Sequence, residues 1–183
     1  MILPIIPYGN PVLKKMGEEI TPEYPELKEF INSMLETLKS SRGLGLAAHQ
    51  VGIPIKLFLV DLSAYGEVNV ALKNFKKVFI NTEILEESGE EWYFEEGCLS
   101  IPGIHEDIKR KPKIKIRYFD ESFVCHEEEF DGLQARVIQH EYDHSQGILM
   151  TDKMAPLRKR MLQKKIKLIL KGDVNTSYKM KFK

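Results

Sequence analysis

Apolar residues recur at helical spacing between residues 24 and 41. The apolar positions are Leu27, Phe30, Ile31, Met34, Leu35 and Leu38. Residues three and four apart share one face of a helix, so this spacing produces a single apolar stripe. Pro22 and Pro25 stand near the start of the stretch, where proline is tolerated. The pattern predicts an amphipathic helix that buries one face.

Five shorter stretches have the pattern of strands, at residues 55–62, 77–81, 90–97, 113–119 and 123–130. The first is a short apolar run, which indicates a buried strand. Residues 113–119 alternate instead, with Ile114, Ile116 and Tyr118 on one face and basic residues on the other. We expect the stretch at 123–130 to pair with this strand.

Two further helices are predicted, at residues 133–145 and 157–171. The order of elements is a helix, several strands of antiparallel type, and then helices, which favours an α+β fold over a doubly wound sheet. We expect the strands to pack around a central helix at 133–145, with the N-terminal helix and a basic C-terminal helix outside. A chain of 183 residues fits one domain over 1–183, with 157–183 as its basic helix and tail.

The composition is that of a soluble globular protein, with 43% hydrophobic and 30% charged residues. Two cysteines, Cys98 and Cys125, are too few for a disulfide scaffold and indicate a reducing compartment. The N-terminal stretch has no basic start, and Pro4 and Pro7 interrupt its apolar residues, unlike a signal peptide. No apolar run approaches the roughly 20 residues that span a bilayer. We therefore expect a cytoplasmic protein without a membrane partner.

The net charge of zero hides an asymmetry along the chain. Residues 157–183 hold ten Lys or Arg and one Asp, a net charge of +9, whereas residues 1–156 hold 17 basic and 26 acidic residues, a net charge of −9. Such a tail either lies against the acidic body or attracts an anionic partner such as RNA. Docking would use the apolar residues Leu157, Met161, Leu162, Ile166, Ile169 and Leu170. The two interpretations are compatible, because a helix can bury one face and present the other.

The stretch RGLGLAAHQVG, residues 42–52, contains the spacing G-x-G-x-x-A at Gly43, Gly45 and Ala48. In a dinucleotide-binding turn this fingerprint follows a strand and opens a helix. Here the glycines follow a predicted helix and lead into a predicted strand. The reversed order argues against a nucleotide site.

The stretch QHEYDHSQG, residues 139–147, carries the clearest chemical signal. His140 and His144 are four residues apart, so on a helix both imidazoles project from one face and can bind one divalent metal. Glu141 stands beside the first ligand as the general base of an H-E-x-x-H site. Gly147 fits the longer metzincin pattern, but its last ligand position holds Met150.

The third ligand is expected upstream, because no glutamate follows Glu141 in the sequence. The upstream candidates are His49, Cys98, His105, Cys125 and His126. Cys98 lies between Gly97, which permits an unusual bend, and Pro102, which ends the segment. Cys125 lies in a regular alternating strand, where we expect it to pack in the core. Cys98 is therefore the preferred ligand.

Three stretches, GLGLAAHQ (43–50), EGCLS (96–100) and QHEYDHSQG (139–147), together resemble the three motifs of peptide deformylase of the bacterial type. With the N-terminal PIIPYGNPVLKK, the resemblance spans most of residues 1–155. It implies a hydrolase that removes the formyl group from the N-terminal methionine of new proteins and releases formate. It also implies the metal ligands Cys98, His140 and His144, with Glu141 as catalytic acid and base.

The resemblance assigns further residues to the reaction. The side-chain amide of Gln50 and the backbone N–H of Leu99 would stabilise the oxyanion, as two aimed donors should. The methionine slot would be lined by Leu44, Phe94, Leu133 and Val137, although core packing explains these apolar residues equally well. The glycines, Gly45 and Gly97 among them, would let the peptide substrate approach the backbone closely.

The metal and the partners follow in part from chemistry and in part from the resemblance. Two histidines and one cysteine with an open position fit zinc by default. The resemblance implies Fe²⁺ in the cell, with Zn²⁺, Ni²⁺ or Co²⁺ able to substitute. The substrate partner is an N-formylmethionyl nascent peptide, and the basic C-terminal helix is a candidate for contact with the ribosome.

Three positions depart from the usual pattern of the resembled family. Ser145 replaces a large apolar residue, His105 replaces a frequent arginine, and Arg136 replaces a common apolar residue. These departures concern peptide affinity and the shape of the pocket, since no catalytic group is lost.

Two other functions share part of this pattern. A metalloprotease that cuts internal peptide bonds shares the helical motif but has no need of Gln50 and Cys98. A structural zinc protein would close the site with a fourth protein ligand.

Overall fold

The computed structural model describes residues 1–182; Lys183, the last residue of the predicted tail and domain, lies outside the described residues. The α-helices are α1 (Leu27–Ser41), α2 (Gly132–Ser145), α3 (Met150–Lys153), α4 (Pro156–Met161) and α5 (Gln163–Lys171). The strands are β1 (Gly45–Ala47), β2 (Leu57–Asp61), β3 (Lys76–Ser88), β4 (Trp92–Gly97), β5 (His105–Arg110), β6 (Lys113–Phe119) and β7 (Cys125–Asp131). Short 3₁₀ helices in the connections are η1 (Pro11–Lys14), η2 (Ala48–Val51), η3 (Ser63–Tyr65) and η4 (Val70–Leu72).

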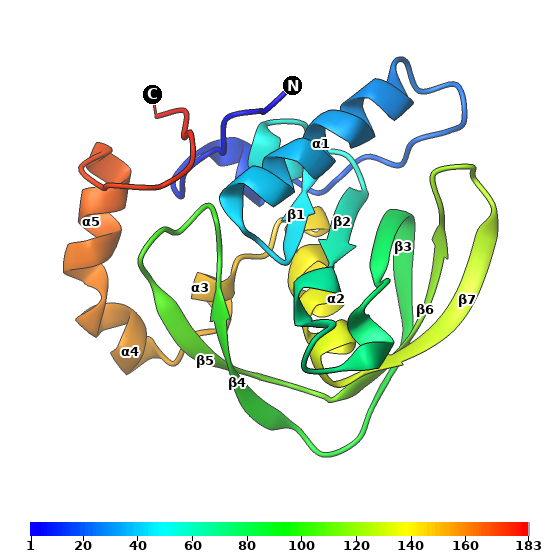
Figure 1. Ribbon diagram of the computed structural model, residues 1–183. Coiled ribbons are helices and arrows are strands. Elements are labelled where there is room, and N and C mark those ends of the chain that lie inside the picture. Colours follow the sequence, from blue (N-terminus) through cyan, green and yellow to red (C-terminus); the bar gives the residue numbers. More distant parts are fainter. Residues whose placement is uncertain (183) are drawn as a thin grey trace.

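Two antiparallel sheets form the β part of the molecule. The larger sheet has five strands in the order β1-β2-β3-β6-β7, and β4 and β5 form a separate hairpin. Figure 1 shows α2 between the five-stranded sheet and the hairpin, with α1 crossing the other side of the sheet. The α+β class and the antiparallel strands around a central helix are thus confirmed.

Within the five-stranded sheet, strand β2 is buried on both faces. Phe58 and Val60 point into a cluster shared with α2, where the Phe58 ring stacks on Phe79 at 4.9 Å between centroids. Leu57 and Leu59 point into the opposite cluster, which includes the apolar stripe of α1. A strand covered on both sides must be apolar at every position, which explains the uninterrupted run in this part of the sequence.

The predictions missed two strands for different reasons. Strand β1 has only three residues and lies in the glycine stretch, which has no strand pattern of its own. Strand β5 is regular, but the side chains on its buried face are Glu106, Ile108 and Arg110. Only Ile108 is apolar, so hydrophobic alternation could not identify the strand.

The predicted basic helix at 157–171 is divided at Leu162 into α4 and α5. Ile166 and Ile169 are buried as expected, but Leu157, Met161 and Leu170 are 69%, 63% and 54% exposed. The docking prediction was therefore wrong for these three residues. Leu157 and Ile166 are nine residues apart and would project from opposite sides of one straight helix. A single helix could not bury both.

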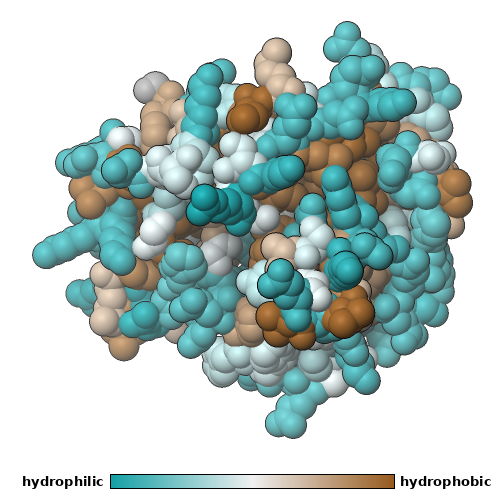
Figure 2. All heavy atoms as spheres, viewed as in Figure 1, coloured by the Kyte–Doolittle hydropathy of each residue, from teal (hydrophilic) through white to brown (hydrophobic). Residues whose placement is uncertain are grey.

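Hydrophilic side chains cover most of the face drawn in Figure 2, with smaller apolar patches among them. Within residues 1–182, none of the helices has the length and apolar content needed to cross a membrane.

Candidate active site

Three side chains from two distant segments meet beside α2. Cys98 directly follows β4, and His140 and His144 lie one turn apart on α2. One ligand atom from each lies within 4.8 Å of the others, and Cys98 Sγ is 3.4 Å from His144 Nε2. Burial lowers the pKa of His144 well below its ordinary value, so its imidazole is neutral, as a metal ligand must be.

This donor set fits a divalent transition metal. One sulfur and two imidazole nitrogens are ligands that zinc and related borderline ions accept. Among residues 1–182, no fourth His, Cys, Asp or Glu joins the group. Three protein ligands leave a coordination position for water or substrate, which is the arrangement of a catalytic rather than a structural site.

Glu96 holds the first histidine in place, and the sequence analysis missed it. Its Oε2 lies 2.8 Å from His140 Nδ1, which leaves Nε2 of the same ring for the ligand cluster. Burial alone would raise the pKa of Glu96, but hydrogen bonds from His140 and Arg110 outweigh it and lower the pKa well below the usual range. The signal was a carboxylate on the same face of the predicted strand as Trp92 and Phe94.

Two buried arginines neutralise this carboxylate. Arg110 Nε donates to Glu96 Oε1 at 2.7 Å, and Arg110 Nη1 reaches Asp143 at 2.7 Å, which links β5 to α2. Arg136 Nη1 donates to Glu96 Oε1 at 3.0 Å, and its guanidinium lies 4.8 Å from the centre of the Trp92 ring. Arg136, one of the three departures from the family pattern, therefore helps to hold Glu96, which in turn orients His140.

The other two departures lie in different surroundings. Ser145 is buried, and its hydroxyl donates to the backbone oxygen of Tyr142 at 2.6 Å. This polar side chain is therefore hydrogen-bonded within α2. His105 lines the pocket and pairs with Gly97 across the hairpin. A Cβ at residue 97 would lie 2.8 Å from His105 Cδ2.

This contact corrects the interpretation of Gly97. The residue is in regular strand β4 and is absent from the positions with positive φ, so it makes no unusual bend. Its missing side chain instead leaves space for the imidazole ring of His105.

Glu141 is buried on α2 next to the ligand cluster. Its Oε2 has no hydrogen-bond partner within residues 1–182, and burial raises its pKa to about 7 before any cation is bound. A Cβ at residue 45 would lie 2.6 Å from Glu141 Cγ, so Gly45 makes room for this carboxyl group. A carboxyl group that titrates near neutral pH is suited to accept and return a proton.

The Gln50 side chain is oriented by its neighbours. The backbone N–H of Ala47 donates to Gln50 Oε1 at 2.9 Å, which fixes the oxygen end of the amide. The Nε2 end therefore faces Cys98 Sγ at 3.5 Å and Ser100 Oγ at 3.4 Å. The stretch at residues 42–52 thus brings an amide donor to the candidate ligand cluster.

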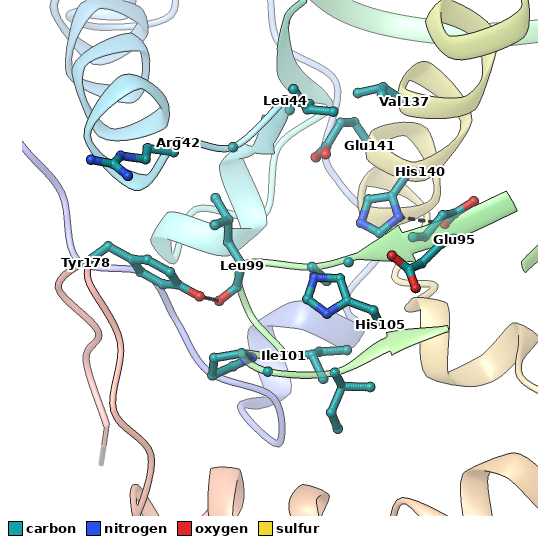
Figure 3. Close-up of a pocket in the computed structure, with 18 of the residues that line it drawn as sticks. Arg42, Leu44, Glu95, Leu99, Ile101, His105, Val137, His140, Glu141 and Tyr178 are labelled. Carbon is teal, nitrogen blue, oxygen red and sulfur yellow. Dashed lines mark hydrogen bonds and ion pairs between the residues drawn. The ribbon is translucent and has the colours of Figure 1, made fainter. Parts of the chain in front are cut away.

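Cys98, His140 and Glu141 line a pocket of about 450 Å³, whereas Gln50 and His144 lie behind its lining. Figure 3 shows Leu44 and Val137 beside Glu141 at one side of this pocket, with His105 and Leu99 nearer its middle and Tyr178 at the other side. The predicted site residues in the lining are Leu44, Gly45, Phe94, Gly97, Cys98, Leu99, Leu133, Val137, His140 and Glu141. The C-terminal residues Asn175–Tyr178, which the sequence analysis did not include, also line it.

The remaining ligand candidates lie elsewhere. Cys125 is exposed on β7, so its predicted packing in the core was wrong. Its strand is the last of the five-stranded sheet, and only Phe130 of β7 is buried. His126 lies 2.7 Å from Asp120, and His49 is buried 3.1 Å from the backbone oxygen of Lys15.

Comparisons with known proteins agree on one family. A family model described as polypeptide deformylase matches residues 2–160. The peptide deformylase of Flavobacterium johnsoniae is 53% identical over 100% of this chain and 96% of its own length, and that of Cytophaga hutchinsonii is 46% identical over 100% and 98%.

Solved structures give the same result. A peptide deformylase from Legionella pneumophila has a TM-score of 0.82 and 32% identity, and covers 94% of this chain and 98% of its own. Peptide deformylase from Thermotoga maritima has a TM-score of 0.76 and 39% identity, and covers 85% and 99%.

Proposed function

The chain belongs to the polypeptide deformylase family, and from this premise we propose roles for the residues of its candidate site. The protein is a metal-dependent hydrolase that removes the N-formyl group from the N-terminal methionine of newly made proteins and releases formate. The observation that carries the residue assignment is the meeting of Cys98, His140 and His144 beside the buried carboxyl group of Glu141.

Cys98, His140 and His144 would hold one divalent cation, with Glu96 orienting the ring of His140. A cation at this site supplies Lewis-acid polarisation of an oxygen atom. We propose Fe²⁺ as the ion in the cell, with Zn²⁺, Ni²⁺ or Co²⁺ able to replace it, since the donor set accepts all four and selection depends on geometry and supply.

Glu141 would move the proton. Its carboxylate takes a proton from the attacking water and returns it to the amine that leaves. The position supports this role, because a buried carboxyl group beside the ligand cluster is within reach of the reacting atoms and can serve first as base and then as acid.

Gln50 and Leu99 would stabilise the negative oxygen that forms when water adds to the formyl carbon. The support for Gln50 is its fixed amide, whose Nε2 end faces the ligand cluster. Leu99 follows the ligand Cys98 directly, so its backbone N–H is close to the same point. Donors held in place before the reaction stabilise a developing charge without reorganisation.

The methionine side chain would pack against an apolar wall of the pocket, which is formed by Leu44, Phe94, Leu133 and Val137. Gly45 and Gly97 would flank the backbone of the formylated peptide at the same wall. In addition, the space left by each glycine is used by a protein side chain, Glu141 and His105 respectively.

The decisive experiment is formate release from a formyl-methionyl peptide, measured anaerobically with added iron. We expect formate and a free methionine amine, with the internal peptide bonds intact. Cleavage of internal bonds would indicate a protease instead. Tight metal binding with neither reaction would indicate a structural site.

We also propose that the protein acts in the cytoplasm, at the ribosome, through its basic C-terminal helices. Ile166 and Ile169 of α5 are buried, whereas Lys164, Lys165 and Lys167 are exposed on the same helix. On α4, Arg158 Nε donates to Glu106 at 2.9 Å, so part of the basic charge is directed at the protein itself. The exposed lysines are free to contact phosphates, in an interaction that salt should weaken.

The test replaces Lys164, Lys165 and Lys167 together by Glu. Turnover of a short formyl peptide should be unchanged, while ribosome co-sedimentation at low salt should fall. Co-sedimentation equal to that of the parent would restrict these helices to a structural role.

A further inference from the structure

The end of the chain returns to the pocket, although it lies beyond the region that the family model matches, residues 2–160. After α5, the chain runs back beside the N-terminal segment, as the red trace near the N-terminus in Figure 1 shows. Residues Asn175–Tyr178 form part of the pocket lining. In Figure 3 the Tyr178 side chain points from this tail towards Leu99.

One N-terminal segment holds both this tail and the catalytic stretches. Ile5 is fully buried. Its N–H donates to Lys179 O at 2.8 Å, and its backbone oxygen accepts from the N–H of Lys181 at 2.9 Å. Three residues further along the same segment, the N–H of Tyr8 donates to Ser100 O at 2.8 Å. The tail therefore has a defined position relative to the turn that follows Cys98.

The same segment also holds the stretch that carries the amide donor. The N–H of Ile6 donates to the backbone oxygen of Gln50 at 2.7 Å. The tail, Gln50 and Ser100 thus bond to Ile5, Ile6 and Tyr8 of one N-terminal segment. The N-terminal segment therefore links the tail to the two stretches that carry the proposed oxyanion donors.

Three successive carbonyl groups of the turn after β4 are each hydrogen-bonded. Cys98 O accepts from the N–H of Ile101 at 2.8 Å, within the turn itself, and Ser100 O accepts from Tyr8. Between them, Leu99 O accepts from the hydroxyl group of Tyr178 at 2.8 Å. This middle bond is made by a side chain, and that side chain belongs to the tail.

We propose that the C-terminal tail contributes to catalysis and that its Tyr178 is a positioning residue for the backbone at Leu99. This inference rests on the proposed role of the Leu99 N–H in holding the oxyanion. The Tyr178 hydroxyl holds the peptide group between Leu99 and Ser100. The bond from Ile101 N–H to Cys98 O holds the preceding peptide group, which carries the Leu99 N–H. Together the two bonds would fix the turn in which this N–H serves as a donor.

The substitution Tyr178→Phe tests this directly, because it removes the hydroxyl group and keeps the ring, which packs against the apolar cluster that contains Ile5 and Leu46. The matched control is Tyr65→Phe, which removes the hydroxyl of an exposed residue in η3. Both are made in the full-length, metal-loaded protein. The measurements are kcat and KM for a formyl-methionyl tripeptide, Tm, metal content, and amide hydrogen exchange over residues 98–101.

We expect Tyr178→Phe to lower kcat about five- to tenfold, the effect of one ordinary hydrogen bond, with KM unchanged. An interaction that acts only in the transition state appears in kcat and leaves KM alone. Amide exchange over residues 98–101 should become faster. Metal content should match the parent, and Tyr65→Phe should match it in every measurement.

A kcat per folded, metal-loaded enzyme equal to that of the parent would overturn the inference. A lower Tm alone would not support it, because a tyrosine with a purely structural role changes stability and not the kcat of the folded enzyme. The parent protein separates this failure from a failure of the proposed function. If the parent releases no formate, the residue assignment as a whole is wrong. If the parent is active and Tyr178→Phe equals it, only the positioning role is wrong.

Discussion

Glu96 shows how one side chain can serve both the metal site and the fold. It is 5% exposed and bonds to His140, Arg110 and Arg136, so one carboxylate orients a ligand and pairs with two buried cations. A buried charge is tolerated only when its partners replace the lost water. Arg110 also pairs with Asp143, and Arg136 also donates to backbone oxygens, whereas His140 Nδ1 bonds to Glu96.

Replacing Glu96 by Gln should therefore lower metal affinity by roughly 10- to 100-fold, the usual effect of losing the group behind a ligand histidine. The loss arises because His140 is no longer held by a charged acceptor. Competition with a metal-binding dye would measure it. The matched control is Glu95→Gln, since Glu95 is the exposed neighbour on the same strand. Equal affinities in the two variants would show that Glu96 does not orient the ligand.

Glu141→Ala should keep the metal and the fold while turnover falls by roughly 10²- to 10⁴-fold, the usual contribution of a positioned acid–base group. The carboxyl group is lost, but all three ligands stay. Steady-state formate release, with metal content measured on the same sample, checks this. Near-normal turnover in a metal-loaded Glu141→Ala protein would exclude the proton-transfer role.

At the scale of elements, α2 is the piece that joins the two sheets. Its apolar residue Ile138 packs against the five-stranded sheet, while Arg136 and His140 reach the β4–β5 hairpin. Helix α5 has a simpler role, since only Ile166 and Ile169 of that helix are buried. Its attachment to the body depends on few contacts.

Ile169→Ala in α5 should lower the free energy of unfolding by about 2–4 kcal/mol, the typical cost of truncating a buried aliphatic side chain. Ile169 is 1% exposed, whereas Leu168 of the same helix is 42% exposed. Leu168→Ala should therefore cost much less. Urea unfolding curves of both variants compare them. Equal losses would mean that α5 does not dock through the face that carries Ile166 and Ile169.

At the scale of the whole molecule, the candidate metal site brings together segments that are far apart in the chain. Cys98 follows the hairpin strand β4, and His140 and His144 belong to α2. The N-terminal segment binds the Gln50 stretch, the turn after Cys98 and the C-terminal tail through backbone hydrogen bonds. A cation held by the three ligands would add a cross-link that exists only in the folded protein.

Removal of the metal with a chelator should therefore lower Tm. A ligand present at 100 times its Kd stabilises the folded state by about 2.7 kcal/mol. For a chain of this size, that corresponds to a fall of roughly 5–10 °C. Differential scanning calorimetry with and without chelator measures the change.

Two cysteine variants control this experiment. Cys98→Ser should abolish most of the dependence of Tm on chelator, because a ligand is missing. Cys125→Ser should keep that dependence, since Cys125 is exposed on β7, away from the ligand cluster. The reverse pattern would show that the ligand assignment is wrong.

The sequence by itself determined the parts of this protein that depend on local spacing. The i, i+4 pair of His140 and His144 required only a helix, and the apolar run at 55–62 required only a strand covered on both faces. Both follow from the geometry of one element. The choice of Cys98 over Cys125 rested on an expected bend at Gly97 and on expected core packing of Cys125. The structure contradicts both reasons, although the candidate ligand atoms do meet at Cys98.

Only the tertiary structure decided which distant groups meet. The buried charges of Glu96, Arg110 and Arg136 are each unfavourable alone and become stable because three separate elements bring them together. Strand β5 was missed because its buried face carries two charged side chains, Glu106 and Arg110, so its burial has no hydrophobic signal. The tail reaches Leu99 because backbone hydrogen bonds to Ile5 place it there, and such bonds carry no side-chain signature in the sequence.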